Sequence, residues 1–170
     1  MTETQHKLGL VLSGGGARAA AHIGALRALT EHGLKPTVIS GASAGALVAA
    51  LYGCRFSLNE MLEVFETTEL FSWNHLGFTK KPGLLDAERL VDVLASLFGG
   101  LTFNDSDTEL HIVTTDLLSG QPHVFTQGPL DRAVTASSAY PGVISPLDID
   151  GRVYADGGIV DNFPIDPLLN

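Results

Sequence analysis

A serine at the centre of residues 41–45 fits the pattern G-x-S-x-G, with Gly41 and Gly45 on either side of Ser43. In this pattern the serine lies on a sharp strand-to-helix turn that exposes its hydroxyl, and larger flanking residues would clash with the turn. The apolar residues 37–40 predict the strand, and an alanine-rich helix is predicted from Ala44. The start of that helix presents free amides and a positive dipole end to a developing anion. The context favours Ser43 as a nucleophile over a small-residue turn that packs a helix on a sheet.

Three consecutive glycines, Gly14, Gly15 and Gly16, follow a short apolar stretch that predicts a buried strand over residues 8–13. Consecutive glycines let backbone amides converge on one anionic oxygen, either a phosphate or a tetrahedral oxyanion. A dinucleotide fingerprint needs glycine where Ala19 stands, and the Gly-Lys-Ser/Thr of a P-loop is absent. The loop therefore favours an oxyanion hole over nucleotide binding. The interpretations of Arg18 are a structural brace for the loop and a contact to an anionic substrate.

A carboxylate precedes the third glycine turn, where Asp156 stands before Gly157 and Gly158. Residues 147–155 alternate around Asp-Gly, which predicts a β-hairpin that delivers Asp156 at the end of its second strand. Taken alone, an aspartate before two glycines usually just caps a turn. However, a serine hydroxyl is a poor nucleophile unless a base takes its proton, and Asp156 is a candidate for that base.

The remaining elements predict an α/β fold of the three-layer α/β/α type, with a mainly parallel central sheet covered on both faces. Residues 110–115 and 122–126 are predicted to form a second hairpin. Helices are predicted over residues 17–32, after a capping box at Ser57 and Glu60, from Asp86 to Gly99, and from Pro129 to about residue 138. With no internal repeat or linker, residues 1–170 are expected to form one domain.

The three sites, in this order, resemble the patatin-like phospholipase family, and especially its bacterial members related to the catalytic domain of neuropathy target esterase. The resemblance covers nearly the whole chain. The motifs that flank the three sites agree with it: Ala21-His22-Ile23-Gly24, Ala139-Tyr140-Pro141-Gly142 and Asp161-Asn162-Phe163-Pro164. The resemblance implies a serine acyl hydrolase that acts on phospholipid or lysophospholipid esters through an acyl-enzyme, without a cofactor. It makes Ser43 and Asp156 the catalytic dyad and the Gly14 loop the oxyanion hole.

Two features depart from the family pattern. The glycine-rich loop of the family usually continues Arg-Gly, whereas Arg18 is followed here by Ala19. A methyl group fits at this position if the residue is already helical. Family domains also normally continue beyond Asn170 with further strand and helix, so a domain truncated at its C-terminal end is one expectation. A missing strand would expose a sheet edge and apolar surface.

Composition restricts the partners. A net charge of -9 with no basic stripe argues against nucleic acid as a partner and against electrostatic anchoring on anionic lipid, but it leaves transient apolar contact with a membrane surface open.

One cysteine, Cys54, and six histidines without ligand spacing predict no metal site. The polar start lacks a signal-peptide pattern, and the longest apolar run, residues 44–54, is about half a membrane span. We therefore expect a soluble cytoplasmic protein; its oligomeric state stays undetermined.

Several alternatives remain. Ser43, Asp116 and His123 follow the Ser-acid-His order of a hydrolase triad, although nothing around His123 resembles a motif. The chain could instead be an anion- or nucleotide-binding module or a catalytically inactive fragment. Residues 71–78 contain several aromatic side chains before Lys80 and Lys81. They predict either a lipid-facing lid over the site or a loop that folds onto the core.

Overall fold

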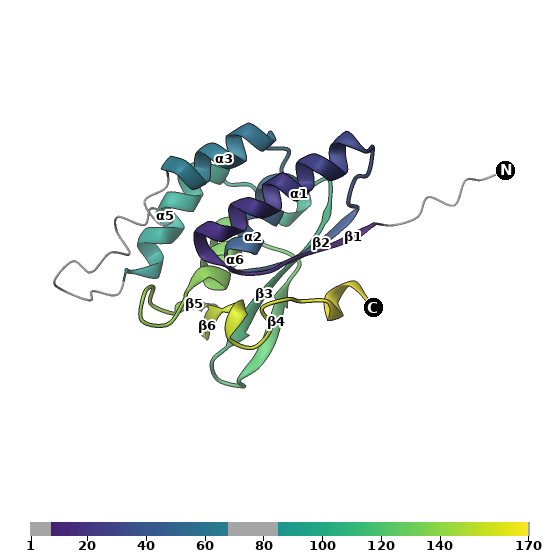
Figure 1. Cartoon of the computed structure of the whole chain (residues 1–170). Helices are drawn as coiled ribbons and strands as arrows, with labels where there is room; N and C mark the ends of the chain where they lie inside the picture. The colour runs from purple at the N-terminus through teal and green to yellow at the C-terminus, as the bar shows by residue number, and fades with distance from the viewer. Residues whose placement is uncertain (1–7, 68–84, 170) are drawn as a thin grey trace.

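A computed structural model describes residues 8–67 and 85–169, which form one sheet and a layer of helices (Figure 1). The predicted lid residues 71–81 lie outside the described residues. The strands are β1 (Gly9–Leu12), β2 (Val38–Ala42), β3 (Glu109–Asp116), β4 (Gln121–Phe125), β5 (Leu147–Ile149) and β6 (Arg152–Asp156). The α-helices are α1 (Ala20–Glu31), α2 (Ala44–Gly53), α3 (Leu58–Thr67), α5 (Ala87–Phe98) and α6 (Leu130–Ser138). Short 3₁₀ helices are η1 (Gly16–Ala19), η2 (Phe103–Asp105), η3 (Gly157–Ile159) and η4 (Asp166–Leu168).

The sheet is mixed. Its strands lie in the order β1-β2-β3-β6-β5, and β4 also pairs with β3. β1, β2 and β3 are parallel, whereas the pairs of β3 with β4, β3 with β6 and β5 with β6 are antiparallel. The α/β class is confirmed, and the predicted parallel arrangement holds for the first three strands. The later strands are antiparallel because both of the predicted hairpins form there.

The described α-helices gather on one face of this sheet (Figure 1). β1, β2 and β3 follow one another in one direction, so two right-handed crossovers place their helices on the same side. In agreement, α1 contacts α2 and α3, and α2 contacts α6, which in turn contacts α5. The helix α2 lies at the centre of this layer and is buried on nearly every side, which explains its continuous apolar sequence.

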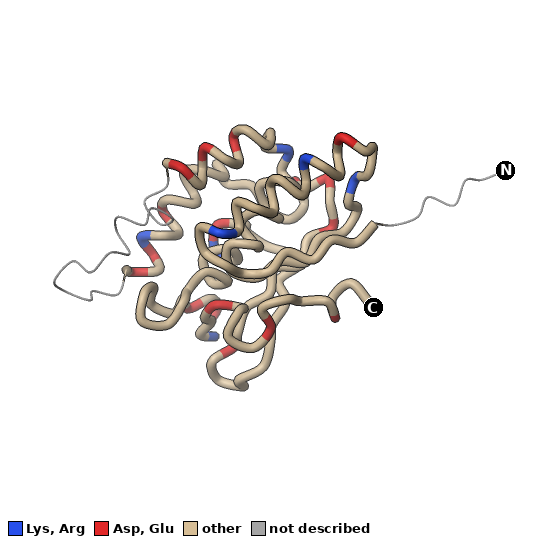
Figure 2. The backbone as a smooth tube through the Cα atoms, in the orientation of Figure 1, with Lys and Arg blue, Asp and Glu red and all other residues tan. Residues whose placement is uncertain are grey.

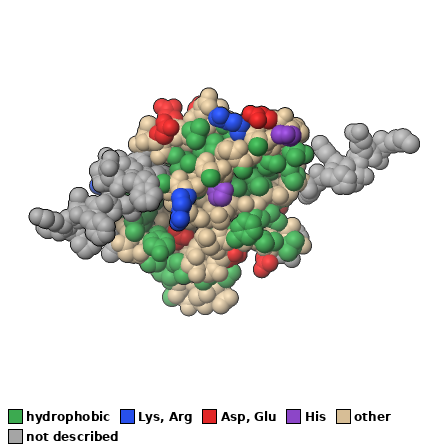
Figure 3. All heavy atoms as spheres, viewed as in Figure 1, with side chains coloured by type: hydrophobic (Ala, Val, Ile, Leu, Met, Phe, Trp, Pro, Cys, Tyr) green, Lys and Arg blue, Asp and Glu red, His purple; other side chains and the backbone are tan. Residues whose placement is uncertain are grey.

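The opposite face of the sheet is partly covered by the C-terminal segment, residues 157–169. η4 contacts β2, and the Leu168 side chain lies against Gly9. Figure 3 shows apolar side chains gathered near the C-terminal end, where Phe163, Ile165 and Leu169 are exposed. Within the described residues, this segment rather than a second layer of α-helices occupies the third layer, so the predicted three-layer arrangement is approximate.

Local signals in the sequence account for several element boundaries. The Ser57 N–H donates to Glu60 Oε2 at 2.6 Å and the Glu60 N–H donates to Ser57 Oγ at 3.2 Å, which confirms the capping box. Asp86 caps α5, and Gly99 ends it in the left-handed conformation. In the last hairpin, the residues at 150 and 151 have φ of 54° and 78°, as a two-residue type I′ turn requires.

Two glycines give opposite predictions for substitution by alanine. A Cβ on Gly45 would meet the backbone oxygens of Leu12 and Ser13, so Gly45→Ala should lower the free energy of unfolding by about 3 kcal/mol. Gly24 lies in α1 with no atom within 4 Å of such a Cβ, so Gly24→Ala should raise it by about 1 kcal/mol. Urea unfolding of both variants checks this. Equal effects at the two positions would refute the close approach of α2 to β1.

Candidate active site

Ser43 occupies a strained turn between β2 and α2. Its φ of 54° and ψ of -129° are rarely adopted by residues other than glycine, and the surrounding structure must enforce them. The glycines on either side allow the turn: a Cβ on Gly41 would lie 2.8 Å from the Gly45 oxygen, and one on Gly45 would lie 2.6 Å from the Ser13 oxygen. The structure therefore places Ser43 on a turn with the geometry of a nucleophile elbow.

The strand β3 brings Asp156 to this turn. β2 pairs with β3 up to Val113, and β6 pairs with β3 from Thr114 onward. The strand β4 pairs with residues 112–116 of β3, and this stretch overlaps the residues paired with β2 and those paired with β6. Because β4 occupies one edge of β3, β2 and β6 must both lie along the opposite edge. Where β2 leaves the sheet at Ser43, β6 takes its place and presents Asp156. The approach is tight, because a Cβ on Gly157 would clash with the Val113 carbonyl oxygen.

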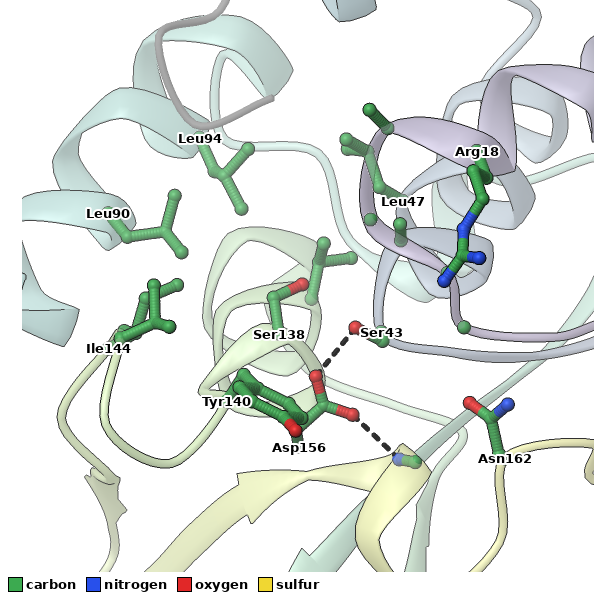
Figure 4. Close-up of a pocket in the computed structure, with 18 residues that line it drawn as sticks. Arg18, Ser43, Leu47, Leu90, Leu94, Ser138, Tyr140, Ile144, Asp156 and Asn162 are labelled. Carbon is green, nitrogen blue, oxygen red and sulfur yellow. Dashed lines mark hydrogen bonds between the residues drawn. The ribbon is translucent and has the colours of Figure 1, made fainter. Parts of the chain in front are cut away.

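The two side chains meet in a short hydrogen bond. Ser43 Oγ donates to Asp156 Oδ2 at 2.6 Å, and the Gly158 N–H donates to Asp156 Oδ1 at 2.7 Å (Figure 4). Asp156 is only 2% exposed. Burial raises the pKa of its carboxyl group, and the hydrogen bonds from Ser43 and Gly158 partly oppose that rise. A carboxylate with a raised pKa is a better proton acceptor than an exposed aspartate.

The glycine loop lies beside Ser43 and lines the same cavity. The Gly14 N–H is engaged, since it donates to the Asn162 carbonyl at 3.3 Å. Gly15 and Gly16 open η1, where N–H groups have no partner inside the helix. Gly16 has φ of 57°. Of the three predicted donors, the amides of Gly15 and Gly16 are therefore the ones that can turn to a substrate oxygen.

The departure of Ala19 from the family pattern is accommodated locally. Ala19 has helical φ and ψ and is 2% exposed, so its methyl group packs into the core. Nearby, His22 Nε2 lies 2.9 Å from the Ser13 carbonyl oxygen. These contacts support the strand end from which the glycine loop begins.

The cavity has a volume of about 540 Å³ and two chemically different sides (Figure 4). The polar side carries Ser43, Asp156, Arg18 and Asn162. Sequence reasoning noted Asn162 only within a flanking motif, although its side chain lies next to Gly14 and Gly158. The apolar side was not predicted, and its residues come from α2, α5, α6 and the loop that follows α6: Leu47, Leu90, Leu94, Val134, Tyr140, Val143 and Ile144.

The alternative triad residues have other contacts. Asp116 Oδ1 accepts the N–H of Leu118 at 2.8 Å, and Oδ2 lies 3.4 Å from Arg152. The His123 ring packs against the rings of Phe125 and Tyr154, and burial lowers its pKa. The Ser43 hydroxyl, in contrast, donates to Asp156. The structure thus brings Ser43 to Asp156 and gives His123 an aromatic environment on β4.

Three expectations from composition concern charge, metal ligands and membrane spans. Figure 2 shows acidic residues spread over the outer helices and loops, with few basic residues between them. Within residues 8–67 and 85–169, no three side chains of the His, Cys, Asp and Glu types gather as metal ligands do. In the same part of the chain, no helix combines the length and apolar character that crossing a bilayer requires.

Comparison with known proteins identifies the family of this chain. The model of the patatin-like phospholipase family matches residues 10–169, and the chain therefore belongs to this family. An uncharacterized NTE family protein of Mycobacterium tuberculosis is 37% identical over 164 residues, which cover 95% of this chain and 45% of that protein. Neuropathy target esterase of Drosophila melanogaster is 35% identical over 98% of this chain and 12% of its own length.

A solved structure shares the fold. VipD from Legionella pneumophila superposes with a TM-score of 0.67 at 20% identity, covering 93% of this chain and 47% of that one. The chain thus spans less than half the length of these relatives.

The family confirms the predicted resemblance and supports hydrolysis of lipids at the level of the family. The roles of Ser43 and Asp156, the acyl-enzyme and the substrate remain predictions, as does the division into one domain.

Replacing the buried Asp156 carboxylate should change how the free energy of unfolding depends on pH. Because the folded pKa of Asp156 lies above its unfolded value, its contribution to stability is full below the unfolded pKa and is lost as pH rises through the folded pKa. Asp156→Asn removes the charge at similar shape, so its free energy of unfolding relative to the wild type should be higher at pH 7 than at pH 4. Urea unfolding at both values measures the difference. A relative stability that does not change with pH would contradict the cost of burying this charge.

Proposed function

We propose that the chain is a lipid acyl hydrolase in which Ser43 is the nucleophile and Asp156 is its base. The 2.6 Å hydrogen bond between their side chains carries the proposal. Membership of the patatin-like phospholipase family supports the reaction class, and the strained backbone of Ser43 supports its role as the attacking group. Neither residue needs a metal or cofactor for this chemistry.

In the proposed reaction, Ser43 Oγ attacks the ester carbonyl while Asp156 Oδ2 accepts its proton. The carbonyl oxygen becomes an oxyanion held by the amides of Gly15 and Gly16, and each such donor is worth about 3 kcal/mol in the transition state. Collapse of the intermediate releases the alcohol with the proton from Asp156 and leaves the acyl group on Ser43. Water, deprotonated by Asp156, then attacks the acyl-enzyme and releases the fatty acid, and Ser43 recovers its proton.

The two sides of the cavity support an amphipathic ester as substrate. An acyl chain fits the apolar side between Leu47, Leu90 and Leu94, while Arg18 and Asn162 face a polar headgroup. A guanidinium at the rim suits the phosphate of a phospholipid or lysophospholipid. Exposed Tyr140 and Val143 at the same cavity would allow transient contact with a lipid surface. A cytoplasmic location stays a prediction.

A fluorophosphonate probe tests the nucleophile. We expect one phosphonyl adduct, located on Ser43 by mass spectrometry, in the wild-type chain, and no adduct in Ser43→Ala. The reason is that the probe reacts with serines activated by a neighbouring base. If a folded wild-type chain took up no probe, the hydrolase proposal would fail, and saturable binding of phosphate or nucleotide at the glycine loop would then favour an anion-binding module.

Two further variants separate a dyad from a triad. Asp156→Asn should lower kcat for a p-nitrophenyl ester by about 10³-fold or more, as expected for loss of a general base acting on a nucleophile. His123→Phe keeps an aromatic ring between Phe125 and Tyr154 and should leave kcat within about 2-fold of the wild type. A large loss in the folded His123 variant with little loss in Asp156→Asn would instead support the triad.

The acyl chain can be tested at α5. Leu94 is 3% exposed and lines the apolar side of the cavity, so Leu94→Phe should shorten the available space. We expect kcat/KM for long-chain p-nitrophenyl esters to fall about 10-fold, with little change for the acetate, since a bulky wall rejects longer chains by about 1–3 kcal/mol. Val93→Phe, at an exposed position of the same helix, is the control. Equal losses on all chain lengths would place the acyl group elsewhere.

A further inference from the structure

A buried hydroxyl on α6 lies behind the nucleophile. Ser137 is 0% exposed, and its Oγ accepts a hydrogen bond from the Ser43 N–H at 2.8 Å. The same hydroxyl donates to the Val113 carbonyl at 2.6 Å. Ser137 therefore joins the backbone of the turn to the backbone of β3, and its hydrogen bond to β3 is buried.

The position of this hydroxyl follows from the pairing of β2 and β3. Near the start of the ladder the Glu109 N–H donates to the Thr37 carbonyl, with Val38 paired to Glu109. In parallel pairing, every second residue of one strand makes both of its backbone hydrogen bonds to the neighbouring strand. On β3 these residues are Glu109, His111 and Val113. The last bond of the ladder would therefore run from the Ser43 N–H to the Val113 carbonyl. Ser137 Oγ takes the place of that bond. It bridges the donor and acceptor that separate when the chain turns out of the sheet at Ser43.

The end of α6 also holds Asp156. The Asp156 N–H donates to the carbonyl of Ala139, two residues beyond Ser137, at 3.0 Å. From β3, Thr115 Oγ1 donates to the Asp156 carbonyl at 2.8 Å. The backbones of Ser43 and Asp156 are thus both fixed at the C-terminal end of α6, Ser43 by Ser137 and Asp156 by the residue directly after the helix, although the two lie 113 positions apart.

We propose that Ser137 is a positioning residue for Ser43, a role that rests on the proposed hydrolase function. Its hydroxyl maintains the strained turn by satisfying the Ser43 N–H and the Val113 carbonyl together. It also keeps the Ser43 N–H away from the oxyanion, which leaves that task to the glycine loop. Ser137 does not touch the substrate, and it acts only by fixing where Ser43 Oγ lies relative to Asp156.

Ser137→Ala removes both hydrogen bonds, and Thr135→Val is a matched control. Thr135 is also 0% exposed on α6, but its hydroxyl has no hydrogen-bond partner among the described residues. Displacement of a reacting group by about 1 Å can cost about 100-fold in rate. We therefore expect Ser137→Ala to lower kcat and the rate of Ser43 phosphonylation by about 10- to 100-fold without raising KM. Thr135→Val should keep both within about 2-fold of the wild type.

Amide hydrogen exchange gives a readout that needs no activity. The Ser43 amide should exchange slowly in the wild type and in Thr135→Val, and at least about 10-fold faster in Ser137→Ala at a temperature where all three are folded. If the wild type reacts with the probe and Ser137→Ala matches it in kcat and in Ser43 exchange, the inference is wrong. A loss of melting temperature with unchanged kcat would reduce Ser137 to a structural role. A wild type that takes up no probe refutes the proposed function instead.

Discussion

The site depends on a change of partner along one edge of β3. Backbone hydrogen bonds hold β2 against that edge up to Val113, and β6 continues from Thr114. The chain can turn out of the sheet at Ser43 only because another strand then occupies the vacated edge. The 2.6 Å hydrogen bond between Ser43 and Asp156 is a consequence of that exchange, and it spans 113 residues of sequence. The position of the reactive pair is therefore determined by sheet pairing rather than by a flexible loop.

Close backbone approach is the cost of this arrangement, and it explains the glycines around the site. Gly45 lies against the end of β1, Gly41 against the first turn of α2, and Gly157 against the Val113 carbonyl. At each of these positions a methyl group would meet backbone atoms, which cannot move aside as a side chain can. The motif glycines thus serve the packing of strands and helix around Ser43, and their spacing reflects where these elements touch.

These local constraints are also the reason that much of the site could be predicted from the sequence. The glycine motifs, the capping box at Ser57 and the Asp-Gly turn at residue 150 each act over a few residues, and each leaves a pattern. Ser137 leaves none, because a serine within an alanine- and serine-containing helix gives no sign of a partner 94 residues away. The apolar side of the cavity was missed for a related reason: Leu90 and Leu94 have the helical spacing of ordinary core residues.

Which face of the sheet the helices cover depends on the order of the strands, and this order could not be predicted from the sequence. Alternating strands and helices predict an α/β fold, but only the order β1-β2-β3 places the crossovers on one face. The hairpins of the second half then add antiparallel strands to a parallel beginning. Family membership agrees with the class of fold, whereas these details come from the pairing itself.

The separation of Ser43 and Asp156 along the chain also bears on how the protein is made. Contacts between distant residues form late, because the chain must lose the entropy of closing a long loop before these contacts can stabilise it. During synthesis, β1, β2 and α2 leave the ribosome well before β6, so Ser43 is present for a time without the Asp156 carboxylate. The serine therefore lacks its hydrogen-bond acceptor until the last hairpin docks. An incomplete chain would thus carry the Ser43 side chain without the carboxylate that accepts its hydrogen bond.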